Sequence, residues 1–206
     1  MKKGFPILLI AVVMALAGCT SLPHRIDLMY IPSGPAQGGS GQLYLATPKG
    51  TTPVAGEQLR WVMGEVKDSD GRVIDDITSP LSPRDQVTDA LTQELQKAGY
   101  QVLKGEAQPE AVSGPYVRLS DVKIDLSESP SWFKITSSAK VSARLEIWRS
   151  GTLVKTERYE ASFEESYPRT RPEELQALLQ KALGGVTDKA IPDVIRNLGS
   201  QKGDGR

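Results

Sequence analysis

Apolar and polar residues alternate strictly along one long stretch of the chain. Across residues 133–147 the odd positions are Phe, Ile, Ser, Ala, Val, Ala, Leu and Ile, and no even position between them is apolar. A period of two is typical of a strand with one buried face, and at about 3.3 Å per residue this strand would extend roughly 50 Å. The turn residues 149–152 and the alternation over 153–164 then predict a long antiparallel hairpin.

Several shorter segments also carry strand patterns. A strand starting at Gln58 and a return strand over 72–74 flank the turn sequence Asp68-Ser69-Asp70-Gly71, which predicts a second hairpin. Across residues 117–126 the apolar phase shifts by one residue, and such a shift predicts a β-bulge. Weaker patterns indicate short strands over residues 26–30, 43–45 and 100–103.

Two segments have the period of an amphipathic helix. The first begins at the N-cap Ser82, followed by Pro83, and stops at Gly99. The second opens at Thr170 and runs to residue 198, where we expect Pro192 to kink or divide it. Together the elements predict one α+β domain over residues 57–198, with a mainly antiparallel sheet that contains a long hairpin and is covered on one face by two helices.

The first nineteen residues carry the pattern of a bacterial export signal. A basic start is followed by a short apolar run, too short to cross a bilayer as a permanent helix. The run ends in Leu16-Ala17-Gly18-Cys19, which matches the lipobox of bacterial lipoproteins. We therefore expect a signal peptide over residues 1–18 and a lipid on Cys19. An ordinary signal peptide with a chance cysteine is the alternative.

The residues after Cys19 predict how the protein is attached. Residues 19–56 are rich in Gly, Pro, Ser and Thr, which predicts a flexible tether with possible short strands, and residues 199–206 form a flexible tail. Acyl chains on the cysteine would make the membrane a partner. Thr20 follows the cysteine instead of the Asp that retains enterobacterial lipoproteins in the inner membrane, which favours the outer membrane, facing the periplasm.

The amino-acid composition excludes several classes of function. The 25 basic and 25 acidic residues balance, which disfavours nucleic acid as a partner. One cysteine excludes a disulfide framework and a cysteine-rich zinc site. The only histidine, His24, falls in the predicted tether, where no pocket would shield or orient it. We therefore predict no catalytic residue, no metal, no cofactor and no enzymatic activity.

The long hairpin offers a candidate surface for a partner. Lys140, Arg144 and Trp148 fall on its polar phase, and Trp132 lies just before its first strand. An exposed tryptophan can anchor a protein interface, so these four residues are the predicted partner face, for an envelope protein or a glycan. Two alternatives stay open: the polar face is only solvated, with the 117–126 strand covering the edge, and the tryptophans cover the ends of the sheet.

The order of these features resembles the YajG-type lipoproteins of Gram-negative bacteria. The resemblance rests on the lipobox, the Gly/Pro-rich tether, the helix from Arg84 that leads into Gly99-Tyr100-Gln101-Val102, the long hairpin and the last helix. It is weaker to the LptE lipopolysaccharide-assembly lipoprotein and to auxiliary lipoproteins of lipid-transporting ABC systems. The resemblance implies the envelope compartment and this architecture, and it offers no catalytic residue to carry across. We therefore expect a non-enzymatic accessory or adaptor of the envelope. The alternative is a component of lipid or lipopolysaccharide transport with an apolar groove between sheet and helices.

Overall fold

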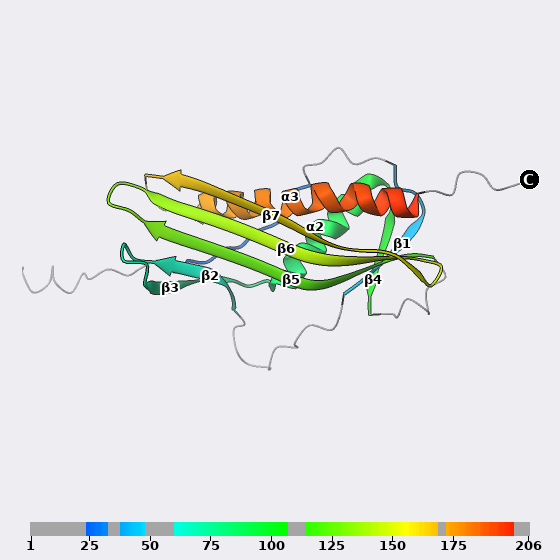
Figure 1. Ribbon diagram of the computed structural model, residues 1–206, viewed down its shortest axis with the longest axis horizontal. Coiled ribbons are helices and arrows are strands. Elements are labelled where there is room, and N and C mark those ends of the chain that lie inside the picture. Colours follow the sequence, from blue (N-terminus) through cyan, green and yellow to red (C-terminus); the bar gives the residue numbers. More distant parts are fainter. Residues whose placement is uncertain (1–23, 33–37, 48–59, 107–113, 169–171, 200–206) are drawn as a thin grey trace, which may run out of the picture.

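The computed structural model describes residues 24–32, 38–47, 60–106, 114–168 and 172–199. In these residues a curled sheet of seven strands carries two helices on one face (Figure 1). The strands are β1 Gln42–Ala46, β2 Trp61–Lys67, β3 Val73–Ser79, β4 Gln101–Gly105, β5 Pro115–Pro130, β6 Ile135–Arg149 and β7 Thr152–Tyr167. The helices are α2 Pro83–Ala98 and α3 Pro172–Leu198.

The three long strands β5, β6 and β7 form an antiparallel meander, and β7 is the edge of the described sheet on that side. The other side of β5 is shared, because β1 pairs with its first half and β2 with its second half, both in parallel. β4 adds to β1 in parallel and β3 adds to β2 antiparallel. The α+β class is confirmed, but the prediction of a mainly antiparallel sheet was wrong, since three of the six described strand pairs are parallel. Those pairs join strands that no tight turn connects.

Both predicted hairpins and the predicted bulge are confirmed. The β2–β3 and β6–β7 pairs are antiparallel neighbours, and the pairing of β5 with β6 shifts between Ser120 and Lys123. At this shift Asp121 adopts a positive φ of 47°. The bulge lies between the part of β5 that pairs with β1 and the part that pairs with β2. It therefore marks the point where the sheet divides into two arms.

The first helix begins and ends as its sequence predicts. Ser82 Oγ accepts a hydrogen bond from the Asp85 backbone N–H at 3.0 Å, and Gly99 closes the helix with a left-handed φ of 110°. α3 runs without interruption through Pro192, so the proline does not divide it. The predicted cap of α3, Thr170, lies outside the described residues. A Cβ on Gly185 would stand 2.8 Å from the Ala161 Cβ, so this glycine allows α3 to lie close to β7.

Part of the predicted tether belongs to the folded domain. Ile26 is 1% exposed and its backbone N–H donates to the Thr78 carbonyl at 2.8 Å, while Leu43 and Leu45 are fully buried in β1. The prediction of a flexible tether was therefore wrong for residues 24–32 and 38–47. Their Gly- and Pro-rich composition suggested a tether, but the short apolar segments within them are long enough to pack against the rest of the sheet. The predicted signal peptide, the predicted lipobox with Cys19 and all but the first residue of the predicted tail lie outside the described residues.

The core fills the space between the sheet and the helices. α3 lies over β6 and β7, and α2 lies over β5 (Figure 1). Buried side chains from both layers meet there, among them Leu91, Leu95, Leu119, Leu145, Leu178 and Leu179. The outer face of the sheet is left to polar side chains, as the alternation along β6 predicts.

Candidate functional site

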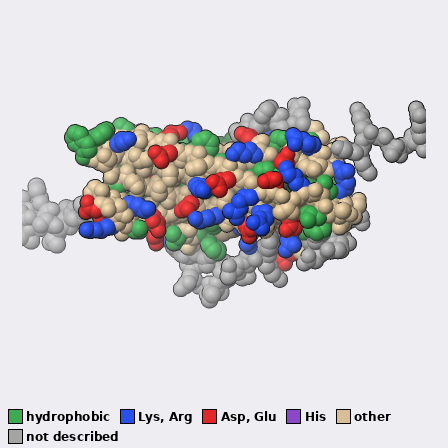
Figure 2. Space-filling view, viewed as in Figure 1, with side chains coloured by type: hydrophobic (Ala, Val, Ile, Leu, Met, Phe, Trp, Pro, Cys, Tyr) green, Lys and Arg blue, Asp and Glu red, His purple; other side chains and the backbone are tan. Residues whose placement is uncertain are grey.

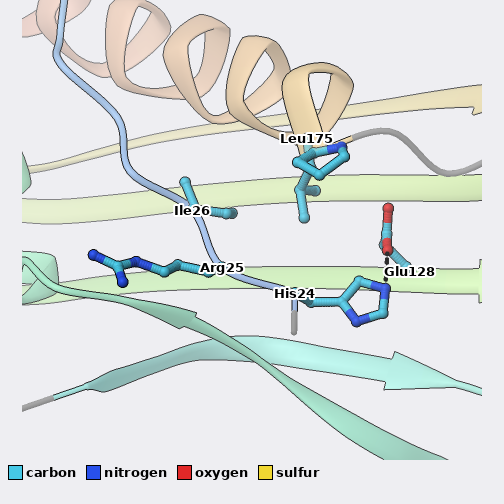
Figure 3. A pocket seen from close by; sticks show the side chains of 6 residues that line it. His24, Arg25, Ile26, Glu128 and Leu175 are labelled. Atoms are coloured by element: carbon cyan, nitrogen blue, oxygen red, sulfur yellow. Dashed lines mark ion pairs between the residues drawn. The ribbon is translucent and has the colours of Figure 1, made fainter. Parts of the chain in front are cut away.

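The only histidine lies against a buried carboxylate. His24 Nε2 is 3.5 Å from Glu128 Oε2 near the end of β5, and His24 Nδ1 is 3.3 Å from Asp75 Oδ2 in β3. A small pocket surrounds this contact, and Figure 3 shows its lining by His24, Arg25, Ile26, Glu128, Pro172 and Leu175. The prediction that no pocket would orient His24 was therefore wrong. Its backbone carbonyl accepts a hydrogen bond from the Thr78 N–H at 2.8 Å, which fixes it beside β3.

Glu128 is the most unusual charge of this cluster because it is only 2% exposed. Burial raises the pKa of Glu128 above its ordinary value, and the hydrogen bond from Ser137 Oγ to Oε1 at 3.1 Å and the charge of His24 act in the opposite direction. Its other oxygen, Oε2, faces His24 and accepts no hydrogen bond from the described residues. The pKa of Asp75 is lowered, first by the Asp76 backbone N–H and then by His24.

The order of these groups does not suit nucleophilic catalysis. In a serine–histidine–carboxylate arrangement the imidazole lies between the hydroxyl and the carboxylate, so that it can take the hydroxyl proton. Here the carboxylate of Glu128 lies between Ser137 and His24. The cavity beside His24, at about 20 Å³, is also far below the roughly 300–1,000 Å³ of most small-molecule sites. We interpret the contacts of His24 as structural, because they attach the start of the described domain to β3 and β5.

Three of the four predicted partner-face residues lie together on the outer face of β6. Lys140 Nζ is 2.8 Å from Glu160 Oε1 on β7, and Arg144 Nη1 is 3.1 Å from Asp121 Oδ2 in the bulge. Trp148 is half-buried and its Nε1–H donates to Glu146 Oε2 at 3.3 Å. Figure 2 shows acidic and basic side chains interspersed over the middle of the sheet. This face is therefore polar but nearly balanced in charge.

The long strand of the predicted partner surface is not a free edge. β5 and β7 pair along both sides of β6, so the 117–126 segment covers this edge, whereas the part of that alternative in which the polar face is only solvated stays a prediction. Among the described strands β7 is the edge on that side. Lys189 Nζ on α3 donates to the Glu160 carbonyl of β7 at 2.6 Å, and many of the exposed side chains of β7 are charged. Both features oppose the addition of a further strand.

Trp132 lies at the opposite end of β6 from Trp148. It is 92% exposed, and its neighbour Phe133 is 61% exposed. Their rings pack edge to face, with centroids 5.0 Å apart. The interpretation that Trp132 covers the end of the sheet was wrong, because a side chain this exposed covers nothing. Figure 2 shows a group of hydrophobic side chains at the end where the β5–β6 loop lies.

Within the described part of the chain, neither helix is long and apolar enough to span a bilayer. The same residues contain no group of three His, Cys, Asp or Glu side chains placed to hold a metal ion. The predicted lipidation residue Cys19 and the predicted lipobox residues Leu16, Ala17 and Gly18 precede the described residues, so the anchor stays a prediction from the sequence.

Comparison with known proteins gives structural likenesses only. No family model matches the chain, and no curated protein matches it. A Xanthomonas campestris protein of the family DUF330 aligns over 86% of this chain and 96% of its own, at 12% identity and a TM-score of 0.49. A minor lipoprotein from Acinetobacter baumannii aligns over 65% and 90%, at 10% identity and a TM-score of 0.40. Rare lipoprotein B from Shewanella oneidensis aligns over 66% and 93%, at 14% identity and a TM-score of 0.35. Likenesses at this level decide neither family nor function.

Proposed function

We propose that this protein is a lipid-anchored envelope lipoprotein that acts as a non-enzymatic adaptor on the periplasmic side of the outer membrane. The observation that carries the proposal is the sequence Leu16-Ala17-Gly18-Cys19, which ends a complete export signal and contains the only cysteine of the chain. Acylation would also remove the free thiol that an exported protein otherwise carries. The resemblance to YajG-type lipoproteins agrees with this compartment.

The position of the folded domain supports a role close to the membrane. Only five Cα–Cα steps separate Cys19 from His24, the first described residue. Such a connection reaches at most about 18 Å. A domain attached in this way stays near the lipid surface and presents the outer face of its long sheet to proteins or glycans of the envelope.

The packing of the domain favours an adaptor over a lipid carrier. A lipid or lipopolysaccharide transport component would need an apolar groove between the sheet and the helices. Leu91 of α2, Leu119 of β5 and Leu179 of α3 occupy this space, and each is fully buried. Opening a groove there would expose the core to water, at about 25 cal/mol for every Å² of apolar surface.

Replacing the predicted acylated cysteine tests the anchor. In the full-length protein with its signal peptide, Cys19→Ser should abolish acyl labelling and move the protein out of the membrane fraction, because the thiol is the atom that would carry the lipid. Metabolic labelling with a fatty acid and fractionation of cell membranes measure both effects. Thr20→Ser, which leaves the lipobox intact, is the control and should behave as the wild type. Unchanged labelling of Cys19→Ser would refute the anchor.

Substitutions on the outer face of β6 test the adaptor role. Trp148→Ala combined with Lys140→Glu should reduce the amount of partner captured from crosslinked membranes by about fivefold or more, because an interface depends on few anchor residues. The measurement is quantitative mass spectrometry of the proteins that co-purify with the wild type. Lys104→Glu on β4 is the matched control, since Lys104 and Lys140 have nearly equal exposure, 51% and 50%, and each is paired with one carboxylate. Equal capture by both variants, with cooperative melting retained, would place the partner surface elsewhere.

A further inference from the structure

The loop between β5 and β6 has an unusual composition for a tight turn. The Ser131 N–H donates to the Lys134 carbonyl at 2.6 Å, so the four residues 131–134 close a compact turn. Its two central positions hold Trp132 and Phe133, although short hairpin loops favour Gly, Asn and Asp. We name these two exposed residues the aromatic tip. A local rule broken at a solvent-exposed position points to a function in contact with something else.

The aromatic tip lies at the end of the molecule where the chain leaves for its anchor. Glu128, which contacts His24, lies two residues before the end of β5 and four residues before Trp132. The segment that follows His24 runs away from this end. His24 shares a pocket with Leu175 near the start of α3, whereas the Ile31 N–H donates to Gln180 Oε1, further along the helix, at 3.2 Å. The residues before His24 therefore start from the tip end.

The distances allow the anchor and the aromatic tip to meet one surface. β5 continues for two residues beyond Glu128 before the turn begins, so the four steps to Trp132 span at most about 13 Å. The five steps from His24 back to Cys19 cover at most about 18 Å. A lipid surface that holds acyl chains on Cys19 is thus within reach of Trp132 without any change in the fold.

The chemistry of the loop fits a lipid headgroup region. Tryptophan is enriched at membrane–water interfaces, where its ring is half in the apolar layer and its N–H meets water. Residues 129–134 contain no acidic side chain, and Lys134 adds a positive charge that anionic lipids attract. The β2–β3 turn at the same end (Figure 1) contains Asp68 and Asp70, with Arg72 Nη1 4.0 Å from Asp70 Oδ2, and residues 68–72 include no aromatic side chain. Contact is therefore favoured at the aromatic tip.

We propose that the aromatic tip inserts into the headgroup region of the membrane that holds the Cys19 lipid. This inference rests on the lipid anchor of the proposed function. Two attachment points at one end would stop the domain from tumbling on its tether and direct the long strands away from the bilayer. Trp148, at the other end of β6, would then face the periplasm.

Tryptophan fluorescence tests the insertion. The full-length acylated protein is placed in vesicles of three parts phosphatidylethanolamine to one part phosphatidylglycerol, with and without brominated acyl chains. Trp61→Phe/Trp148→Phe leaves Trp132 as the only tryptophan, and its emission should shift to the blue and fall about twofold with brominated lipid. The matched variant Trp61→Phe/Trp132→Phe leaves Trp148, whose emission should stay unchanged. In the otherwise wild-type chain, Trp132→Phe alone should remove most of the quenchable emission, which covers the case in which the double variants misfold.

Vesicle flotation distinguishes a failure of the lipid anchor from a failure of the aromatic-tip insertion. Acylated protein that floats with the vesicles while Trp132 emission is neither shifted nor quenched would overturn the insertion and leave the anchor standing. Acylated protein that does not float would overturn the anchor and the insertion together. Flotation with selective quenching of Trp132 is the result we expect.

Discussion

Gly64→Ala should destabilise the protein by about 3 kcal/mol or more, because no space exists for a side chain at this position. Gly64 of β2 pairs with Leu126 of β5 in a parallel ladder of three residue pairs. A Cβ on Gly64 would lie 1.9 Å from the Leu126 carbonyl oxygen and 2.5 Å from its carbonyl carbon. These are backbone atoms of a central strand and cannot rotate away. The methyl group would therefore separate β2, and the β3 strand beyond it, from the sheet.

Chemical denaturation of the purified soluble domain measures this effect. Gly114→Ala is the matched control, since a Cβ on Gly114 would have no described atom within 4 Å, and its stability should stay within about 0.5 kcal/mol of the wild type. A stability of Gly64→Ala equal to that of Gly114→Ala would show that β2 does not approach β5 as closely as the structure has it.

Tyr30→Ala should lower the free energy of unfolding by about 3–5 kcal/mol, as for other large buried side chains. Tyr30 is 6% exposed and joins the N-terminal segment to both helices. Its hydroxyl donates to Glu94 Oε1 of α2 at 2.7 Å and lies 3.1 Å from Thr187 Oγ1 of α3. Removal of the ring would leave a cavity between the sheet and the helices. It would also leave the side-chain oxygens of Glu94 and Thr187 without the Tyr30 hydroxyl, at a place that water cannot reach.

The adjacent residue provides the control for Tyr30. Met29 is 86% exposed, so Met29→Ala should change the free energy of unfolding by less than about 0.5 kcal/mol. Thermal or urea unfolding of the two variants beside the wild type makes the comparison. If Tyr30→Ala melted like Met29→Ala, residues 24–32 would be a loose tether, as the sequence predicted.

The elements that sequence reasoning predicts well are those with local signals. The cap at Ser82 and the stop at Gly99 act within a few residues of the helix they bound, and the alternation along β6 is uninterrupted. The predicted start of that strand at Phe133 was wrong, because the alternation continues into the loop. Phe133 fits the buried phase but is 61% exposed, and β6 begins at Ile135. Turn closure by Ser131 and Lys134, which the pattern does not encode, keeps Phe133 in the loop, so the strand begins two residues later than predicted.

The mixed sheet could not be predicted because its parallel pairs are remote in sequence. Tyr44 of β1 pairs with Tyr116 of β5, and Gly64 of β2 pairs with Leu126. Hydrophobic alternation says which face of a strand is buried but not which strand lies beside it. Parallel neighbours also lack the short turn that identifies a hairpin.

The candidate sites also differ in whether their residues are close together or remote in the sequence. The lipobox around Cys19 is a contiguous motif and can be read directly, as can the polar phase that holds Lys140 and Arg144. The His24 contact has no such signal, since Asp75 lies 51 residues away and Glu128 belongs to a third segment. A clue was present in the alternation of Ile26, Leu28 and Tyr30, which indicates that the chain is already packed close to His24.

The contacts of the N-terminal segment also impose an order on folding. Ile31 is bonded to Gln180 across 149 residues, and Tyr30 reaches Thr187 across 157. In a chain that is exported from its N-terminus, these bonds cannot form until most of α3 has crossed the inner membrane. Contacts this distant are slow to form, because the intervening chain must first be ordered. Residues 30 and 31 are thus synthesised early but dock late. If Cys19 is acylated as proposed, this interval would leave time for lipid transfer and signal cleavage before the domain closes.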